Sequence, residues 1–242
     1  MKYIFIMLCF VFASQCNAQL PEGYSVVKNI TDSMQLVQFK GKVGLFSPIY
    51  NEVMLMPEYD SIVRPNLPAQ GLVLIYKKGK AGIAEIASGA VFTLPIYDEI
   101  HQGGILHPTL ALVKRKNKYG LIELISGYEV LHPKYDEIYK FGPYGEHFAL
   151  VRIGNLFGLV DDETGYELVP CKYEEIGIPG SHGKDTFLIR KNGKFGITGM
   201  EGYAMIECIY DKIEFSETSG YTCRKGIETF YFDLNGLPYT PE

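Results

Sequence analysis

The chain has 242 residues, of which 47% are hydrophobic and 21% are charged, a composition that excludes a disordered chain or a coiled coil. The net charge of −5 is spread along the chain without a basic stripe. The sequence therefore argues against nucleic acid as a partner, because it offers no positive field to a phosphate backbone.

The first predicted element is an export signal at residues 1–18. Lys2 precedes an apolar run from Tyr3 to Ala13 and a small-residue exit, which is the layout of a secretory signal peptide. We expect a mature domain of residues 19–242 that is exported to the periplasm or the cell exterior. In an alternative, Cys16 is acylated and anchors an envelope lipoprotein. No later segment has the ~20 apolar residues of a transmembrane helix.

After this segment the chain is a tandem repeat with markers 38 residues apart, such as Gly82 and Gly120. Two markers in phase over five copies indicate a repeat architecture. The first is the glycine of a G-K-x-G-like motif, at Gly44, Gly82, Gly120, Gly158 and Gly196. The second is the tyrosine of a P-x-Y-D-E-I-like motif, at Tyr59, Tyr97, Tyr135, Tyr173 and Tyr210. A single domain is thus predicted to hold repeats at 36–71, 72–109, 110–147, 148–186 and 187–220, followed by a degenerate cap at 221–242.

One unit illustrates the expected strands. The apolar runs and turn residues predict strands at 110–113, 119–125, 128–131 and, as a short fourth strand, 135–138. Gly127 provides the positive φ of a tight turn. Pro133 cannot donate to a ladder, so it should break the strand or mark an edge.

The expected fold class is all-β, because no segment sustains an apolar helical period. The first strand of each unit is apolar at consecutive positions, so both its faces should be covered by neighbouring units. We predict a tandem array of five antiparallel β-meander repeats with degenerate terminal units, including an extra strand at 24–30. An open, twisted array is favoured over a closed β-propeller.

The residues that could carry chemistry have structural interpretations. Acidic pairs such as Asp136–Glu137 follow the repeat tyrosine and are expected to accept backbone hydrogen bonds in turns, with calcium binding or acid–base catalysis as alternatives. Cys171 and Cys208 occupy the position of Pro133 and are expected to be small buried side chains, with a disulfide between adjacent units as the alternative. We expect no catalytic residue, metal or cofactor.

The G-K-x-G motif followed by P-x-Y-D-E-I resembles the bacterial WG (or KWG) repeat family over residues 36–213. The chain has no tryptophan, and the position before the repeat glycine is aromatic in three copies only. The resemblance implies a β-rich tandem-repeat domain, common in exported bacterial proteins, and it brings no catalytic residues.

Function is expected to lie in the variable connections at 64–71, 101–109, 139–147 and 177–186, which should emerge on one side of the stack. The candidate partner-binding residues are Tyr139, Phe141, Tyr144 and His147. The leading hypothesis is a non-enzymatic binding or scaffold module for a protein or glycan. The alternatives are an extracytoplasmic glycan hydrolase and a purely structural envelope protein.

Overall fold

The computed structural model describes residues 19–65, 71–101, 108–140, 142–144 and 147–241. These residues form 24 strands in six four-stranded antiparallel sheets, and no described residue lies in a helix. No described segment could therefore cross a membrane as an apolar helix. The prediction of an all-β repeat array is confirmed.

The sheets follow one another along the chain, each made of four consecutive strands. Their strands are β1 (Ser25–Thr31), β2 (Met34–Phe39), β3 (Lys42–Ser47) and β4 (Glu52–Tyr59); β5 (Ser61–Val63), β6 (Leu72–Lys77), β7 (Lys80–Glu85) and β8 (Val91–Tyr97); β9 (Glu99–Ile100), β10 (Leu110–Arg115), β11 (Lys118–Glu123) and β12 (Glu129–Tyr135); β13 (Glu137–Ile138), β14 (Phe148–Ile153), β15 (Leu156–Asp161) and β16 (Glu167–Tyr173); β17 (Glu175–Ile176), β18 (Thr186–Lys191), β19 (Lys194–Gly199) and β20 (Ala204–Tyr210); and β21 (Lys212–Ser216), β22 (Gly220–Lys225), β23 (Glu228–Phe232) and β24 (Pro238–Tyr239).

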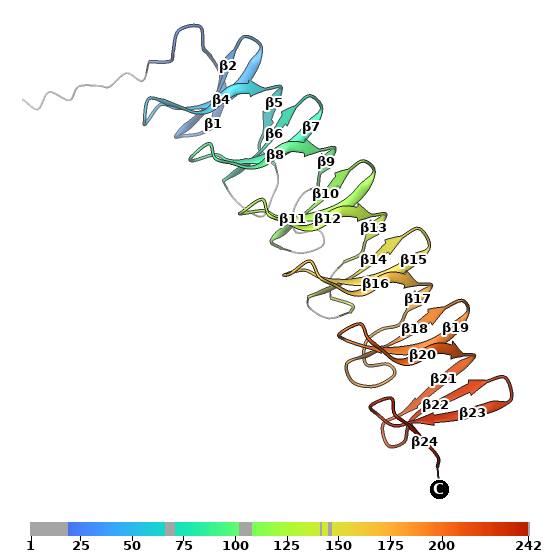
Figure 1. Ribbon diagram of the computed structural model, residues 1–242. Coiled ribbons are helices and arrows are strands. Elements are labelled where there is room, and N and C mark those ends of the chain that lie inside the picture. Colours follow the sequence, from blue (N-terminus) through green and yellow to red (C-terminus); the bar gives the residue numbers. More distant parts are fainter. Residues whose placement is uncertain (1–18, 66–70, 102–107, 141, 145–146, 242) are drawn as a thin grey trace, which may run out of the picture.

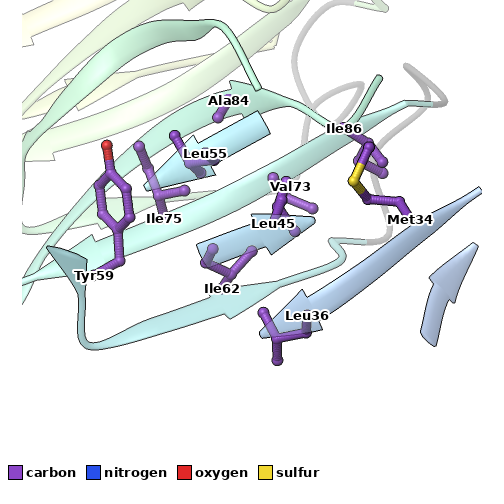
Figure 2. Packing of buried hydrophobic residues seen from close by; sticks show 10 residues of the cluster. All are labelled: Met34, Leu36, Leu45, Leu55, Tyr59, Ile62, Val73, Ile75, Ala84 and Ile86. Carbon is purple, nitrogen blue, oxygen red and sulfur yellow. The ribbon is translucent and has the colours of Figure 1, made fainter. Parts of the chain in front are cut away.

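The six sheets stack face to face in an open array, with the first and last sheets at opposite ends (Figure 1). Between each pair of neighbouring sheets lies one layer of apolar core. The first layer joins Leu45 and Tyr59 of sheet 1 to Val73 and Ile75 of sheet 2 (Figure 2). Four further layers repeat this arrangement along the stack. The open array favoured on sequence grounds is what the structure has.

The first long strand of each inner sheet contributes to two core layers. In β6, Val73 and Ile75 point to sheet 1, whereas Leu72 and Leu74 point to sheet 3. All four side chains are buried. This explains the consecutive apolar residues, because side chains alternate between the two faces of a strand and both faces are covered here.

The division between units differs from the one expected. The segment 135–138 was predicted to be the fourth strand of its own unit. In the structure Tyr135 ends β12, and Glu137–Ile138 forms β13, the first strand of the next sheet. The chain steps from one layer to the next at Asp136, so each short strand belongs to the sheet that follows it.

A bulge in the last strand of the sheet explains why proline is tolerated there and why the facing position requires the repeat glycine. Leu121 pairs with Leu131 and Tyr119 with Tyr135, so β12 uses four residues where β11 uses two. Pro133 lies in this bulge, on an edge strand where its missing N–H is tolerated. The bulged segment crosses directly over Gly120. A Cβ built on Gly120 would lie only 2.3 Å from the carbonyl oxygen of Leu131, so only glycine fits.

The acid after the repeat tyrosine joins neighbouring sheets. The Asp136 carboxylate accepts hydrogen bonds from Lys118 Nζ of sheet 3 at 2.5 Å and from the Gly154 amide of sheet 4 at 2.7 Å. A lysine Nζ and a backbone amide of the next sheet likewise donate to the carboxylates of Asp60, Asp98 and Asp211. These carboxylates are therefore held by a lysine and by the hairpin backbone of the next sheet, in line with the structural interpretation of the repeated acid.

These acidic contacts predict a loss of stability in acid. The Lys118 hydrogen bond, and after it the Gly154 amide, hold the pKa of Asp136 below its usual range. Since the folded-state pKa is lowered, the stabilisation is present above the unfolded pKa of about 3.9 and is lost as pH falls through the folded pKa. The variant Asp60→Asn/Asp98→Asn/Asp136→Asn should melt below wild type at pH 7, and the difference should shrink towards pH 2–3.

Thermal midpoints followed by circular dichroism between pH 7 and pH 2 would measure this. Asp32→Asn, at an exposed turn, is the matched control and should leave the midpoint unchanged. A gap between wild type and the triple variant that stays constant over this range would contradict the charged role of the acids.

The two end sheets are closed differently. At the N-terminal end, the Gln19 amide donates to Asn51 Oδ1 at 2.8 Å, and the Tyr24 ring stacks on Phe39. The C-terminal unit is a complete four-stranded sheet that begins at Lys212, earlier than the cap expected at 221–242. In this sheet Phe230 occupies the position that the repeat glycine has in the others, since it pairs with Cys223 as Gly196 pairs with Ile189. The Phe230 ring packs edge-on against Tyr210, with ring centres 5.7 Å apart.

Candidate functional site

The stack has two contrasting edges, at which the strand ends lie. The edge formed by the β2–β3 turn and its counterparts is named the hairpin edge here. The opposite edge, named the turn edge, holds the connections between the third and fourth strands at residues 47–52, 85–90, 123–128, 161–166, 199–203 and 233–237. The long connections start β6, β10, β14 and β18 at this same edge, because Leu72 pairs with Glu85 and Leu110 with Glu123. Figure 1 shows the turns projecting along one side of the array.

From sheet 2 onward, each turn docks on the preceding sheet through a glycine. Gly165 has a φ of +69°, and a Cβ built on it would lie 1.9 Å from the carbonyl oxygen of Val130 in sheet 3. Gly127 and Gly202 meet sheets 2 and 4 in the same way. Only glycine combines a positive φ with so close an approach. The contact fixes the direction in which the chain leaves the turn.

The residue after the turn glycine is an exposed tyrosine in three successive sheets. Tyr128 and Tyr166 are each 64% exposed, and Tyr203 is 75% exposed. In the last sheet Leu237 takes this place, and in the first sheet Tyr50 lies in the corresponding turn; both are exposed. Sheets 3, 4 and 5 therefore present a row of tyrosines along the turn edge.

The turns of this edge are acidic. Every charged residue within the six turns is a carboxylate, namely Glu52, Glu85, Glu123, Asp161, Asp162, Glu163, Glu201 and Asp233. The long connections beside them contribute a few cations, Lys140 and Lys184 among them. On the hairpin edge the turns are rich in lysine, and ion pairs such as Lys118–Asp136 bind much of that charge within the chain.

A cleft of about 300 Å³ opens on the turn edge between sheets 3 and 4. Tyr128 and Glu123 line it from sheet 3, and Asp162 and Glu163 line it from sheet 4, with His147 from the preceding connection. His147 Nδ1 lies 3.2 Å from Asp162 Oδ1.

Asp162 departs from the repeat. Asp162 is equivalent to Leu124 of sheet 3, because the backbone amide of each donates to the carbonyl of a residue at the end of the preceding connection. Leu124 is a core residue. The Asp162 side chain is only 2% exposed. A buried carboxylate beside a histidine thus replaces an apolar residue in one sheet only, which marks this cleft as the most individual part of the turn edge.

The candidate binding residues lie in different surroundings. Tyr139 is half-buried; its hydroxyl donates to Glu137 Oε2 at 2.8 Å and its ring lies 6.4 Å from Phe157. Tyr144 packs against the core between sheets 4 and 5 and donates to the Ile176 carbonyl. Phe141 lies outside the described residues. Of the three candidates that the structure describes, only His147 lines the cleft.

The repeat tyrosines lie in the core layers, all 6% exposed or less. Burial raises the pKa of Tyr135, and a hydrogen bond of 2.8 Å to Glu167 Oε1 of the next sheet raises it further. Cys171 and Cys208 are free thiols. Cys171 lies in the β16 bulge, where burial raises its pKa to about 11, so it is a poor nucleophile at neutral pH.

Sequence reasoning missed the row of exposed tyrosines. The signal was present, because Tyr128, Tyr166 and Tyr203 each follow a turn glycine at nearly the repeat spacing. Aromatic residues next to a predicted strand are more often part of the core than of the surface.

Comparison with known proteins gives one family match. Residues 119–157 match the model of the WG containing repeat. No curated protein matches. Among solved structures, a eukaryotic initiation factor is 13% identical, with 90% of this chain and 64% of that chain covered and a TM-score of 0.31.

Two further solved structures are similar at the same level. For Kluyveromyces lactis Hsv2 the identity is 4%, the coverage is 69% of this chain and 58% of that chain, and the TM-score is 0.27. For Porphyromonas gingivalis PorZ, described as a bacterial surface component of the type-IX secretion system, these values are 10%, 87%, 33% and 0.29. The chain thus spans less than two thirds of all three proteins, and scores of this size support no inference about arrangement or function.

Proposed function

Residues 119–157 match the model of the WG containing repeat. From this match and the stacked repeats of the fold we propose that the chain is a non-enzymatic binding module working outside the cytoplasm. The module presents the turn edge of its stack to a protein or glycan. Export is supported by the signal-peptide layout of residues 1–18, which lie outside the described residues.

The observation that carries this proposal is the row of exposed tyrosines. A large aromatic side chain in water does not stabilise the fold, whereas aromatic residues are enriched among those that dominate binding energy. Here three such side chains, Tyr128, Tyr166 and Tyr203, repeat at equivalent positions on adjacent sheets. A ligand that contacts all three gains from multivalency, because the second and third contacts are intramolecular.

Removal of the row should abolish binding and leave the fold intact. The variant Tyr128→Ala/Tyr166→Ala/Tyr203→Ala is expected to lower capture of partner material from a native envelope extract by more than about tenfold, since each anchor contributes about 1–2 kcal/mol. Both protein and carbohydrate in the captured fraction would be quantified.

Met56→Ala/Leu94→Ala is the matched control. Both side chains are exposed and apolar, at 62% and 67%, and they belong to last strands of sheets rather than to turns. This control should capture as wild type does, and circular dichroism should show all variants folded. Equal capture by wild type and the tyrosine variant would refute the proposal.

A further inference from the structure

Several tyrosine rings of this chain make cation–π contacts with its own lysine and arginine side chains. Cations lie over the rings of Tyr59, Tyr97, Tyr119, Tyr135 and Tyr173, at distances such as 5.1 Å between Lys134 Nζ and the Tyr135 ring centre. Among the described residues, no cation lies over Tyr128, Tyr166 or Tyr203. The exposed tyrosines of the turn edge thus have open faces for a cation from outside.

The carboxylates around the exposed tyrosines also favour a cationic partner. The turns contain carboxylates and no lysine or arginine, and two of these acids project into solvent next to the tyrosines. Glu163 has a 72% exposed side chain, and Glu201 is also exposed. Aromatic faces beside carboxylates attract ammonium and guanidinium groups, through the ring quadrupole and through direct charge.

We propose that the partner of the turn edge is an extended, basic polypeptide segment whose lysine or arginine side chains lie over Tyr128, Tyr166 and Tyr203. This inference rests on the proposed binding function and names the chemistry of the partner. The cleft between sheets 3 and 4 receives one of these cations, because the Tyr128 ring, Glu123 and Glu163 line it together.

The geometry of the stack sets the spacing of the cations. Sheets that pack face to face are about 10 Å apart. An extended peptide in the polyproline II conformation advances about 3.1 Å per residue with three residues per turn, so every third side chain lies on the same side. One tyrosine position therefore corresponds to about three residues of the partner. A segment with a basic residue at every third position places one cation on each of sheets 3, 4 and 5.

A direct test uses a fluorescent 12-residue peptide with lysine at every third position and glycine or serine between. Anisotropy with the purified protein should show binding that weakens more than about tenfold as ionic strength rises from about 0.02 to 0.3 M, because salt screens exposed charges. A peptide with glutamate in place of lysine should not bind. A peptide of identical composition with adjacent lysines should bind more weakly, since it cannot match the sheet spacing.

Matched variants locate the contact. Tyr166→Ala should weaken binding of the lysine peptide about fivefold, whereas Tyr166→Phe should bind as wild type because the ring face remains. Glu163→Gln/Glu201→Gln should lower both the affinity and its salt dependence. Met56→Ala should have no effect.

The outcomes separate this inference from the function it rests on. Lysine-peptide binding that ignores salt, Tyr166→Ala and the acid variants overturns the inference, as does the absence of binding. A neutral linear glucan that binds in a tyrosine-dependent manner, while the lysine peptide does not, overturns the basic partner and leaves the binding module standing. Failure of the binding module itself appears in the envelope-capture experiment, where the tyrosine variant would capture as wild type does.

Discussion

Replacement of Gly120 by alanine is expected to destabilise the protein by about 3 kcal/mol, at the upper end of the range for overpacking. The added methyl group would lie 2.3 Å from the Leu131 carbonyl oxygen and 2.7 Å from the Pro133 nitrogen. Both are backbone atoms, so no side-chain rotation relieves the contact, and the β12 bulge has to move. Chemical denaturation of the purified variant would measure the change in the free energy of unfolding.

Gly199→Ala is the control for this substitution. Gly199 ends β19, and the nearest atom to the position that its added methyl group would take is the flexible Met205 Sδ at 3.7 Å. The expected change is within about 0.5 kcal/mol. If Gly120→Ala were as mild as Gly199→Ala, the crossing of the bulge over the repeat glycine would be wrong.

Truncation of the buried Tyr135 is expected to cost about 2–4 kcal/mol, as for other large-to-small changes in a core. The ring is 1% exposed and packs between sheets 3 and 4. Tyr135→Ala leaves a cavity and also removes the hydrogen bond to Glu167. Tyr135→Phe separates the two losses, because it keeps the ring and should cost only about 1 kcal/mol. Denaturant midpoints at constant slope would give both values.

Tyr128 supplies the internal comparison for this experiment. It belongs to the same sheet and is 64% exposed, so Tyr128→Ala should change the free energy of unfolding by no more than about 0.5 kcal/mol. Equal costs at Tyr128 and Tyr135 would mean that the division between core and turn-edge tyrosines is incorrect.

The period and the strand class could be read from the sequence, because turn glycines and apolar runs act locally and recur in phase. The open array was favoured over a closed β-propeller, but local patterns do not fix closure. The residues at which one sheet ends and the next begins could not be read from the sequence. Pro133 signalled an edge, but only the tertiary path shows that β12 continues through it as a bulge and that Glu137–Ile138 joins the next sheet. The choice depends on which layer of core the residues after Asp136 enter, and their sequence fits either layer.

The sequence pointed to the proposed binding surface only in part. The sequence directed attention to the long connection at 139–147, and from it His147 lies at the cleft while Tyr144 packs into the core. Exposure of Tyr128 depends on the contact of Gly127 with the carbonyl of Phe92 in the preceding sheet. That contact joins residues in different repeats, and a search within one unit does not find it.

The contacts of each sheet with its two neighbours have a consequence for how such a chain can change length. Among the described residues, the contacts that join sheets, such as those of the Asp136 carboxylate and of the turn glycines, reach the adjacent sheet. A whole unit can therefore be gained or lost by duplication or deletion without rebuilding the rest. Each unit adds about 10 Å of edge. If the turn edge binds as proposed, the number of units sets the length of ligand that the stack can contact.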